Sequence, residues 1–161
     1  MRYYLCWSSL RLNSIDQFVK NWGSKNAMVA INADDILELE SKLTVVLPDS
    51  YKYLISTYGL VHSPNVLTKI CDLNADVSSA VQDFLSLDDV CSLSKLYEMT
   101  GMPKGHILFA SDCKGNMFCF KLSDCVSKQI DSPVWFYDQG NCSVQKVADS
   151  FTEWLDEFNK L

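Results

Sequence analysis

The sequence has no run of apolar residues close to the roughly 18 that a membrane-spanning helix requires. Its first ten residues are also too short a stretch, and too polar after Trp7, to form the apolar core of a signal peptide. We therefore expect a soluble protein that stays in the cytoplasm and does not bind membranes.

Closely spaced cysteine pairs are also missing. The chain has seven cysteines, an odd number, with no CxxC motif. A disulfide framework is therefore not expected, and we predict reduced thiols that are mostly buried. Cys113, Cys119 and Cys125 recur at six-residue intervals, but structural zinc sites usually take two ligands from a much tighter knuckle. The sequence thus predicts neither a metal ion nor another cofactor.

A recognisable catalytic set is absent as well. His62 and His106 are the two histidines, and no local motif places a cysteine at a helix N-terminus beside either of them. The turn at residues 112–116 lacks the repeated glycines and the following helix of a phosphate-binding loop. We expect a protein that is not an enzyme, with a thiol enzyme as the open alternative.

The residues that are present favour one folded domain. The chain has 161 residues, 48% of them hydrophobic, and it includes 4 Trp, 7 Tyr and 8 Phe. That composition offers enough apolar surface to offset the entropy lost on folding.

Helical patterns dominate the first 60 residues, after a strand predicted over Met1 to Trp7. A capping box at Ser14 to Gln17 predicts a first helix, with Gly23 at its end. Asn32 is the expected N-cap of a second helix, with its acidic residues in water, including Glu40. Pro48 opens a third, and Gly59 has the position of its left-handed C-terminal cap.

The remainder alternates strand and helix patterns. We predict a strand at Val66 to Cys71, a helix from Ser86 to Gly101, an antiparallel hairpin at residues 107–122, and a third strand at Val134 to Tyr137. A closing helix that starts near Ser143 carries an apolar stripe. These elements predict an α+β fold in which helices from both ends of the chain pack on a β meander.

Charge suggests a binding surface. The net charge of −6 disfavours nucleic acid and anionic lipid but attracts basic proteins. No basic residue occurs between Lys69 and Lys95, and this interval predicts a docking surface for a cationic protein. The alternatives are a merely solvated face, or docking on the helices near Asn32 and Ser143. The candidate partner-binding residues in the interval are Asp72, Asp76, Asp83, Asp88 and Asp89.

Several motifs, in their order, resemble the SUKH superfamily of Smi/Knr-like domains. Those domains have an acidic helix, a Leu-Pro-x-x-Tyr helix, a β meander and a closing Ser-Phe-x-x-(Trp/Phe)-Leu helix. The matching segments here are residues 36–43, 47–59, 103–112, 115–116, 133–136 and 147–155. The resemblance assigns residues 32–161 to the domain and leaves residues 1–31 as an extension, a strand plus a short helix packed on it.

This resemblance implies a function. Bacterial members act mainly as immunity proteins that bind and block toxins, often nucleases, of contact-dependent or other polymorphic systems. The expected partner is therefore a cognate toxin domain with a basic surface, neutralised by stoichiometric binding. Eukaryotic relatives look like regulatory modules, so an intracellular adaptor is the alternative.

Overall fold

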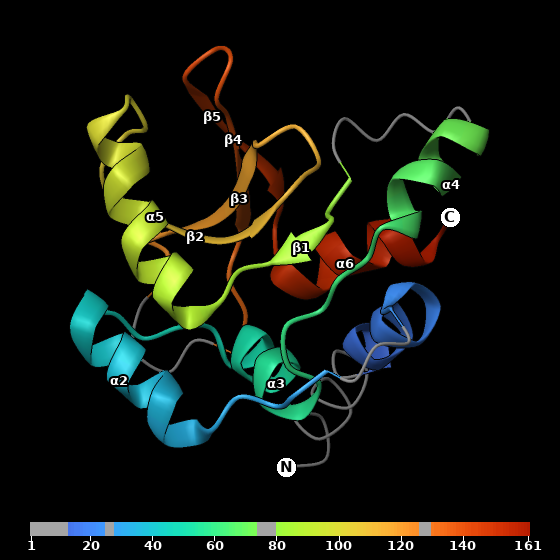
Figure 1. Ribbon diagram of the computed structural model, residues 1–161, viewed down its shortest axis with the longest axis horizontal. Coiled ribbons are helices and arrows are strands. Elements are labelled where there is room, and N and C mark those ends of the chain that lie inside the picture. Colours follow the sequence, from blue (N-terminus) through green and yellow to red (C-terminus); the bar gives the residue numbers. More distant parts are fainter. Residues whose placement is uncertain (1–12, 25–27, 74–79, 126–129) are drawn as a thin grey trace.

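The described residues form one antiparallel sheet in which the strands follow their order in the chain. The computed structural model describes residues 13–24, 28–73, 80–125 and 130–161. Its five-stranded sheet has the order β1-β2-β3-β4-β5 (Figure 1). This meander, flanked by helices, confirms the predicted α+β fold. The strands are β1 (Asp83–Phe84), β2 (His106–Ser111), β3 (Met117–Lys121), β4 (Val134–Asp138) and β5 (Ser143–Ala148).

The β2–β3 hairpin closes through one carboxylate. Asp112 Oδ1 accepts hydrogen bonds from the backbone N–H groups of Lys114 and Asn116, both at 2.8 Å. Gly115, at φ 86°, supplies the left-handed residue that the turn requires. The hairpin predicted from the sequence is confirmed.

Three predicted helix starts are also confirmed. Asn32 caps α2 (Ala33–Leu43), Pro48 precedes α3 (Asp49–Thr57), and Ser86 caps α5 (Leu87–Met99). One detail of α2 differs from the prediction. Glu40 does not face water: its side chain is 12% exposed, and Oε1 accepts a 2.7 Å hydrogen bond from the Leu47 N–H.

The strand predicted at Val66 to Cys71 is wrong, because these residues lie in α4 (Asn65–Leu73). Val66 and Ile70 are buried one helical turn apart, whereas Leu67 between them is exposed. The β-branched side chains suggested a strand, but the four-residue spacing of the buried positions is the helical period.

The closing helix starts later than the sequence predicts. Residues 143–148 form β5 and pair with β4, and α6 spans Phe151–Asn159. Ser150 is its N-cap and accepts a hydrogen bond from the Glu153 N–H at 3.1 Å. The apolar stripe is confirmed from Phe151 onward, but Val147 belongs to the strand.

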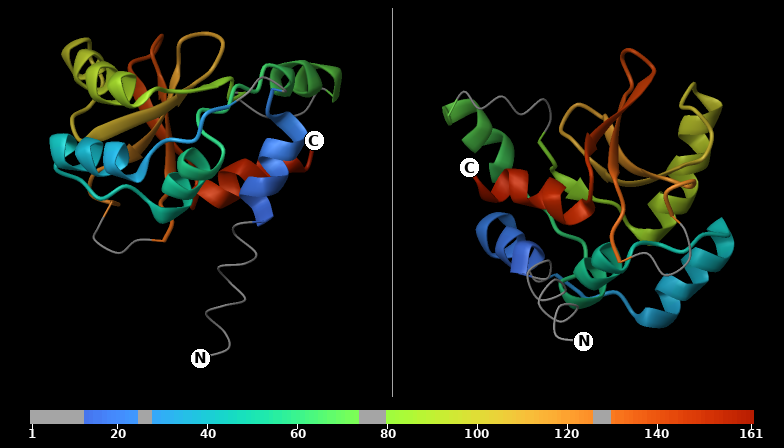
Figure 2. Two further views of the ribbon diagram at one scale, coloured as in Figure 1. Left: turned by 60° about the horizontal axis from the view of Figure 1, so that its bottom comes forward. Right: turned by 180° about the vertical axis from the view of Figure 1, so that it is seen from behind.

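Helices cover both faces of the sheet (Figures 1 and 2). On one face, Trp154 of α6 packs on Phe118 of β3, with ring centroids 4.7 Å apart. On the other, Tyr97 of α5 meets Tyr137 of β4 at 5.8 Å. The α5 helix is tied to β2 as well, because the Leu108 N–H donates to Ser94 Oγ at 3.0 Å, where the β2–β3 register shifts.

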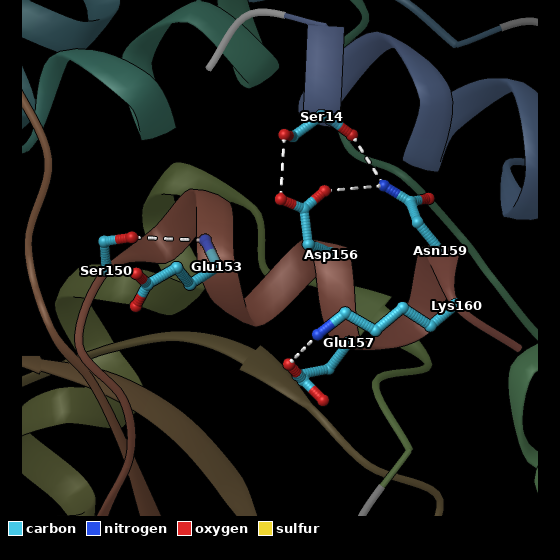
Figure 3. Close-up of polar contacts among 7 residues, drawn as sticks. All are labelled: Ser14, Ser150, Glu153, Asp156, Glu157, Asn159 and Lys160. Carbon is cyan, nitrogen blue, oxygen red and sulfur yellow. Dashed lines mark hydrogen bonds and ion pairs between the residues drawn. The ribbon is translucent and has the colours of Figure 1, made fainter. Parts of the chain in front are cut away.

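A helix at residues 13–22 lies beside α6, as Figures 1 and 2 show. Its Phe18 is fully buried, and the Trp22 indole donates to the Phe158 carbonyl at 3.1 Å. The sequence predicts Ser14 as the N-cap of this helix, but residue 13 is already helical, so Ser14 lies within the helix. Its hydroxyl donates instead to Asp156 of α6 at 3.0 Å (Figure 3).

The described cysteines divide between the core and the surface. Among the six described cysteines, Cys119 and Cys125 are buried, whereas Cys71, Cys113 and Cys142 are exposed, so the prediction of mostly buried thiols is wrong. The strand expected at residues 1–7 lies outside the described residues. Within the described ranges, each helix is too short or too polar to cross a bilayer.

Candidate protein-binding groove

An open groove of about 940 Å³ runs between α2 and α5. Four partly or fully buried apolar side chains lie along it, two of them from the loops that precede α2 and follow α3. The groove is therefore apolar at its base and bounded by two helices. The apolar residues are Ile31, Leu39, Leu60 and Leu87.

Carboxylates lie on both walls of the groove. Asp35 and Glu38 come from α2, and Asp88 comes from α5. Two of these belong to the first turns of their helices, where free backbone N–H groups and the helix dipole stabilise negative charge. The preference of helix N-termini for acidic residues thus places carboxylates on opposite walls of the groove.

Lys42 links the two walls electrostatically. It forms a 2.7 Å ion pair with Glu38, and the hydrogen bond from Lys42 lowers the pKa of the Glu38 carboxyl. The pKa of Lys42 is raised, mainly by Glu38 and to a smaller extent by the charge of Asp88. Asp35 and Asp88 themselves form no ion pair with any residue that the structure describes.

The groove continues into a second hollow of about 600 Å³. Ile31, Asp35 and Leu60 line both hollows. His62 also lines the second hollow, and its Nδ1 is hydrogen-bonded to Asp83 at the start of β1. The two hollows together offer a longer surface than the α2–α5 groove alone.

The structure brings together some of the acidic residues predicted to bind a partner. Asp88 lines the groove, and Asp83 pairs with His62 at its extension. Asp89 is exposed beside Asp88 and accepts a 2.7 Å hydrogen bond from the Ser86 hydroxyl, which completes the cap of α5. Asp72 is exposed on α4, at the opposite end of the molecule from α5 (Figure 1). Asp76 lies outside the described residues.

Sequence reasoning did not assign Asp35 and Glu38 to a site. The sequence pattern places both on the solvated face of a helix, and it offers the helix near Asn32 only as an alternative docking surface. The available indication was an N-cap followed at once by acidic residues. That pattern predicts the first turn of a helix but not the second helix that faces it.

The described residues offer little for catalysis. None of their His, Cys, Asp and Glu side chains form a group of three that could hold a metal ion. His106 is buried and bonded through Nδ1 to the Pro103 carbonyl at 2.9 Å. Burial raises the pKa of the Cys119 thiol to about 12 and that of Cys125 to about 11, which disfavours the nucleophilic thiolate.

Comparison with known protein families gives one result. The model of the SMI1 / KNR4 family (SUKH-1) matches residues 30–157. This match confirms the resemblance inferred from the ordered motifs, and it includes both helices that form the groove. No curated protein matches the sequence significantly.

Proposed function

Because this chain belongs to the SMI1 / KNR4 family (SUKH-1), we propose that it is an immunity protein that neutralises a cognate toxin domain. The family is known generally for immunity-type proteins. The toxin is a basic, nuclease-type domain of a polymorphic or contact-dependent system. Binding is stoichiometric, takes place in the cytoplasm and needs no catalysis by this chain.

The observation that carries the proposal is the α2–α5 groove. It combines an apolar base, which can bury a partner's side chains, with Asp35 and Asp88 on opposite walls, which form no ion pair among the described residues. Such a surface suits a cationic protein better than a nucleic acid or an anionic metabolite, because either of these would be repelled.

The net charge of −6 supports the same partner. A negative field steers a basic domain toward the groove and can raise the association rate toward about 10⁸–10⁹ M⁻¹s⁻¹ at low salt. Asp83 and Asp89, near the groove, extend its negative region, and Asp72 with Asp76 adds to the overall field.

Co-expression tests the proposal directly. The C-terminal domain of a toxin encoded beside this gene is expressed in cells with and without this chain, and survival is scored. We expect full protection, and a purified mixture should lose toxin activity with an end point at equimolar ratio. Unprotected cells would overturn the proposal and favour the adaptor function. A sub-stoichiometric end point would indicate that this chain acts as an enzyme on the toxin.

A further inference from the structure

We infer that the α2–α5 groove receives an amphipathic, cationic α-helix of the partner. This inference rests on the proposed function and adds the form of the bound segment. An apolar side chain of that helix packs on Leu39, Leu60 and Leu87, and a Lys or Arg side chain lies between Asp35 and Asp88.

The backbone chemistry of the walls favours a helix over an extended segment. Both walls are α-helices, whose internal N–H and C=O groups are already paired within the helix. An extended segment in the groove would find no ladder of free backbone groups and would leave its own unpaired. A helix satisfies its backbone internally and presents only side chains, as helix-in-groove recognition requires.

The extent of the groove also fits a helical occupant. Its lining spans two helical turns on each wall, from Asp35 to Lys42 on α2 and from Asp88 to Lys95 on α5. A helix lying there meets both walls over two turns, which is the spacing of anchor residues at i, i+3, i+4 and i+7.

The carboxylates of the groove favour a partner helix that is cationic rather than anionic. Glu38 is already neutralised by Lys42, whereas Asp35 and Asp88 are exposed and form no ion pair among the described residues. An anionic helix would add like charges beside them. Lys95 also lines the groove, but it lies two helical turns from Asp88 along α5. At the Asp35–Asp88 end, a cationic side chain adds counter-charge to both walls at once.

A steric test uses two residues of α5. Ser92 lines the groove and is exposed, so Ser92→Trp places an indole inside it. Leu96, 50% exposed on the same helix, does not line the groove, so Leu96→Trp is the matched control. With the neighbouring toxin domain as the probe in calorimetry, we expect at least a roughly tenfold loss of affinity for Ser92→Trp and a change within about twofold for the control.

A charge test separates contact in the groove from long-range attraction. Asp35→Lys with Asp88→Lys is compared with Asp34→Lys plus Glu153→Lys; all four acids are exposed in the first turns of their helices, and the two pairs change the net charge equally. Only the first pair lines the groove. We expect it to weaken binding at least roughly tenfold more than the second. The corresponding Asn pairs, with Gln at Glu153, perturb folding less and should show the same order.

The form of the bound segment is read by cross-linking. Ser92→p-benzoylphenylalanine should link to a helical, Lys- or Arg-containing segment of the toxin domain. One outcome is that the wild type binds and protects, while Ser92→Trp binds like Leu96→Trp and the Lys and Asn pairs at Asp35 and Asp88 bind like their control pairs. In that case the groove inference fails and the proposed function stands. A cross-link to an extended or acidic segment also overturns the inference. A wild type that does not bind at all overturns the proposed function.

Discussion

The buried carboxylate of Asp131 accepts a 2.6 Å hydrogen bond from the hydroxyl of Thr152 in the first turn of α6. The same carboxylate accepts from the Phe151 N–H at 2.8 Å and from Ser50 Oγ of α3 at 2.9 Å. One side chain therefore joins the start of α6 to the start of α3, and the free N–H groups of α6 stabilise its negative charge.

We predict that Asp131→Ala is strongly destabilising. The substitution leaves several buried donors without an acceptor, which costs about 3 kcal/mol or more of unfolding free energy. Urea unfolding followed by circular dichroism measures the loss. Glu157→Gln on the same α6 removes an exposed ion pair with Lys160 (Figure 3) and should leave the midpoint almost unchanged. Equal midpoints for the two variants would contradict the assigned role of Asp131.

Gly59 and Gly115 form a natural comparison, because both have φ 86°. At Gly59 an added Cβ would lie 2.2 Å from the Val29 carbonyl oxygen, whereas at Gly115 the nearest atom is the flexible Gln139 Oε1 at 3.5 Å. We expect Gly115→Ala to cost about 1 kcal/mol from backbone strain alone, and Gly59→Ala to cost clearly more. Thermal unfolding of both variants checks the order, and a smaller loss at Gly59 would refute it.

The difference between these two glycines shows where sequence reasoning stops. A helix C-terminus and a hairpin turn have local patterns, so the left-handed cap at Gly59 and the turn before Met117 could be predicted. The close approach of Val29 to Gly59 depends on how the chain enters α2 and has no local pattern. The same holds for Asp131, which stands in a polar loop of the sequence yet organises two helices.

The two misassigned elements have related causes. Residues 65–73 contain β-branched side chains, and only the burial of Val66 and Ile70 shows that tertiary packing selects the helix. Residues 143–148 form a strand, but Val147 continues the apolar spacing of the next helix, so the pattern predicts one longer helix. For the groove, the sequence predicts Asp88 as a binding residue. The packing of α2 beside α5 has no local sequence pattern and is seen only in the fold.

The helix at residues 13–22 should be essential for folding, although the family match begins only at residue 30. Phe18 is fully buried, with its ring centroid 6.0 Å from that of Phe158 and 6.3 Å from that of Phe84. We expect Phe18→Ala to lower the unfolding free energy by about 3–5 kcal/mol. The exposed Lys20 offers a control on the same helix, and Lys20→Ala should have little effect. A mild effect of Phe18→Ala would indicate that the helix at residues 13–22 contributes little to the core.

The buried thiols predict a loss of stability at alkaline pH. Burial raises the pKa of Cys119 from 9.0 to about 12, so the folded protein holds a proton that the unfolded chain releases above pH 9. Stability is therefore fully present below about pH 9 and falls as the pH rises toward 12. Unfolding midpoints across this range measure the effect, and Cys119→Ala should flatten the slope. A slope unchanged by that substitution would exclude Cys119 as a cause.

Exposed and buried thiols should also differ in reactivity. At pH 8 a thiol reagent such as DTNB should label Cys71, Cys113 and Cys142 rapidly, because they are exposed. Cys119 and Cys125 should react only after denaturation, since the thiolate is the reactive form and their raised pKa values keep it scarce. Mass spectrometry of the labelled peptides identifies the sites, and early labelling of Cys119 would show that the core opens readily.

Charge reversal at Asp72 and at Asp88 should separate the two surfaces that carry the predicted acidic residues. Both side chains are exposed, and they lie on α4 and α5 at opposite ends of the molecule (Figure 1). If the partner docks in the α2–α5 groove, Asp72→Lys lowers only the steering field, so it should slow association at low salt and leave dissociation unchanged. Asp88→Lys loses a direct contact and should also speed dissociation, at every salt concentration.

Surface plasmon resonance with the toxin domain at increasing ionic strength resolves the two rates. Faster dissociation of Asp72→Lys alone would move the interface to α4, because screening by salt removes long-range attraction but not the loss of a contact.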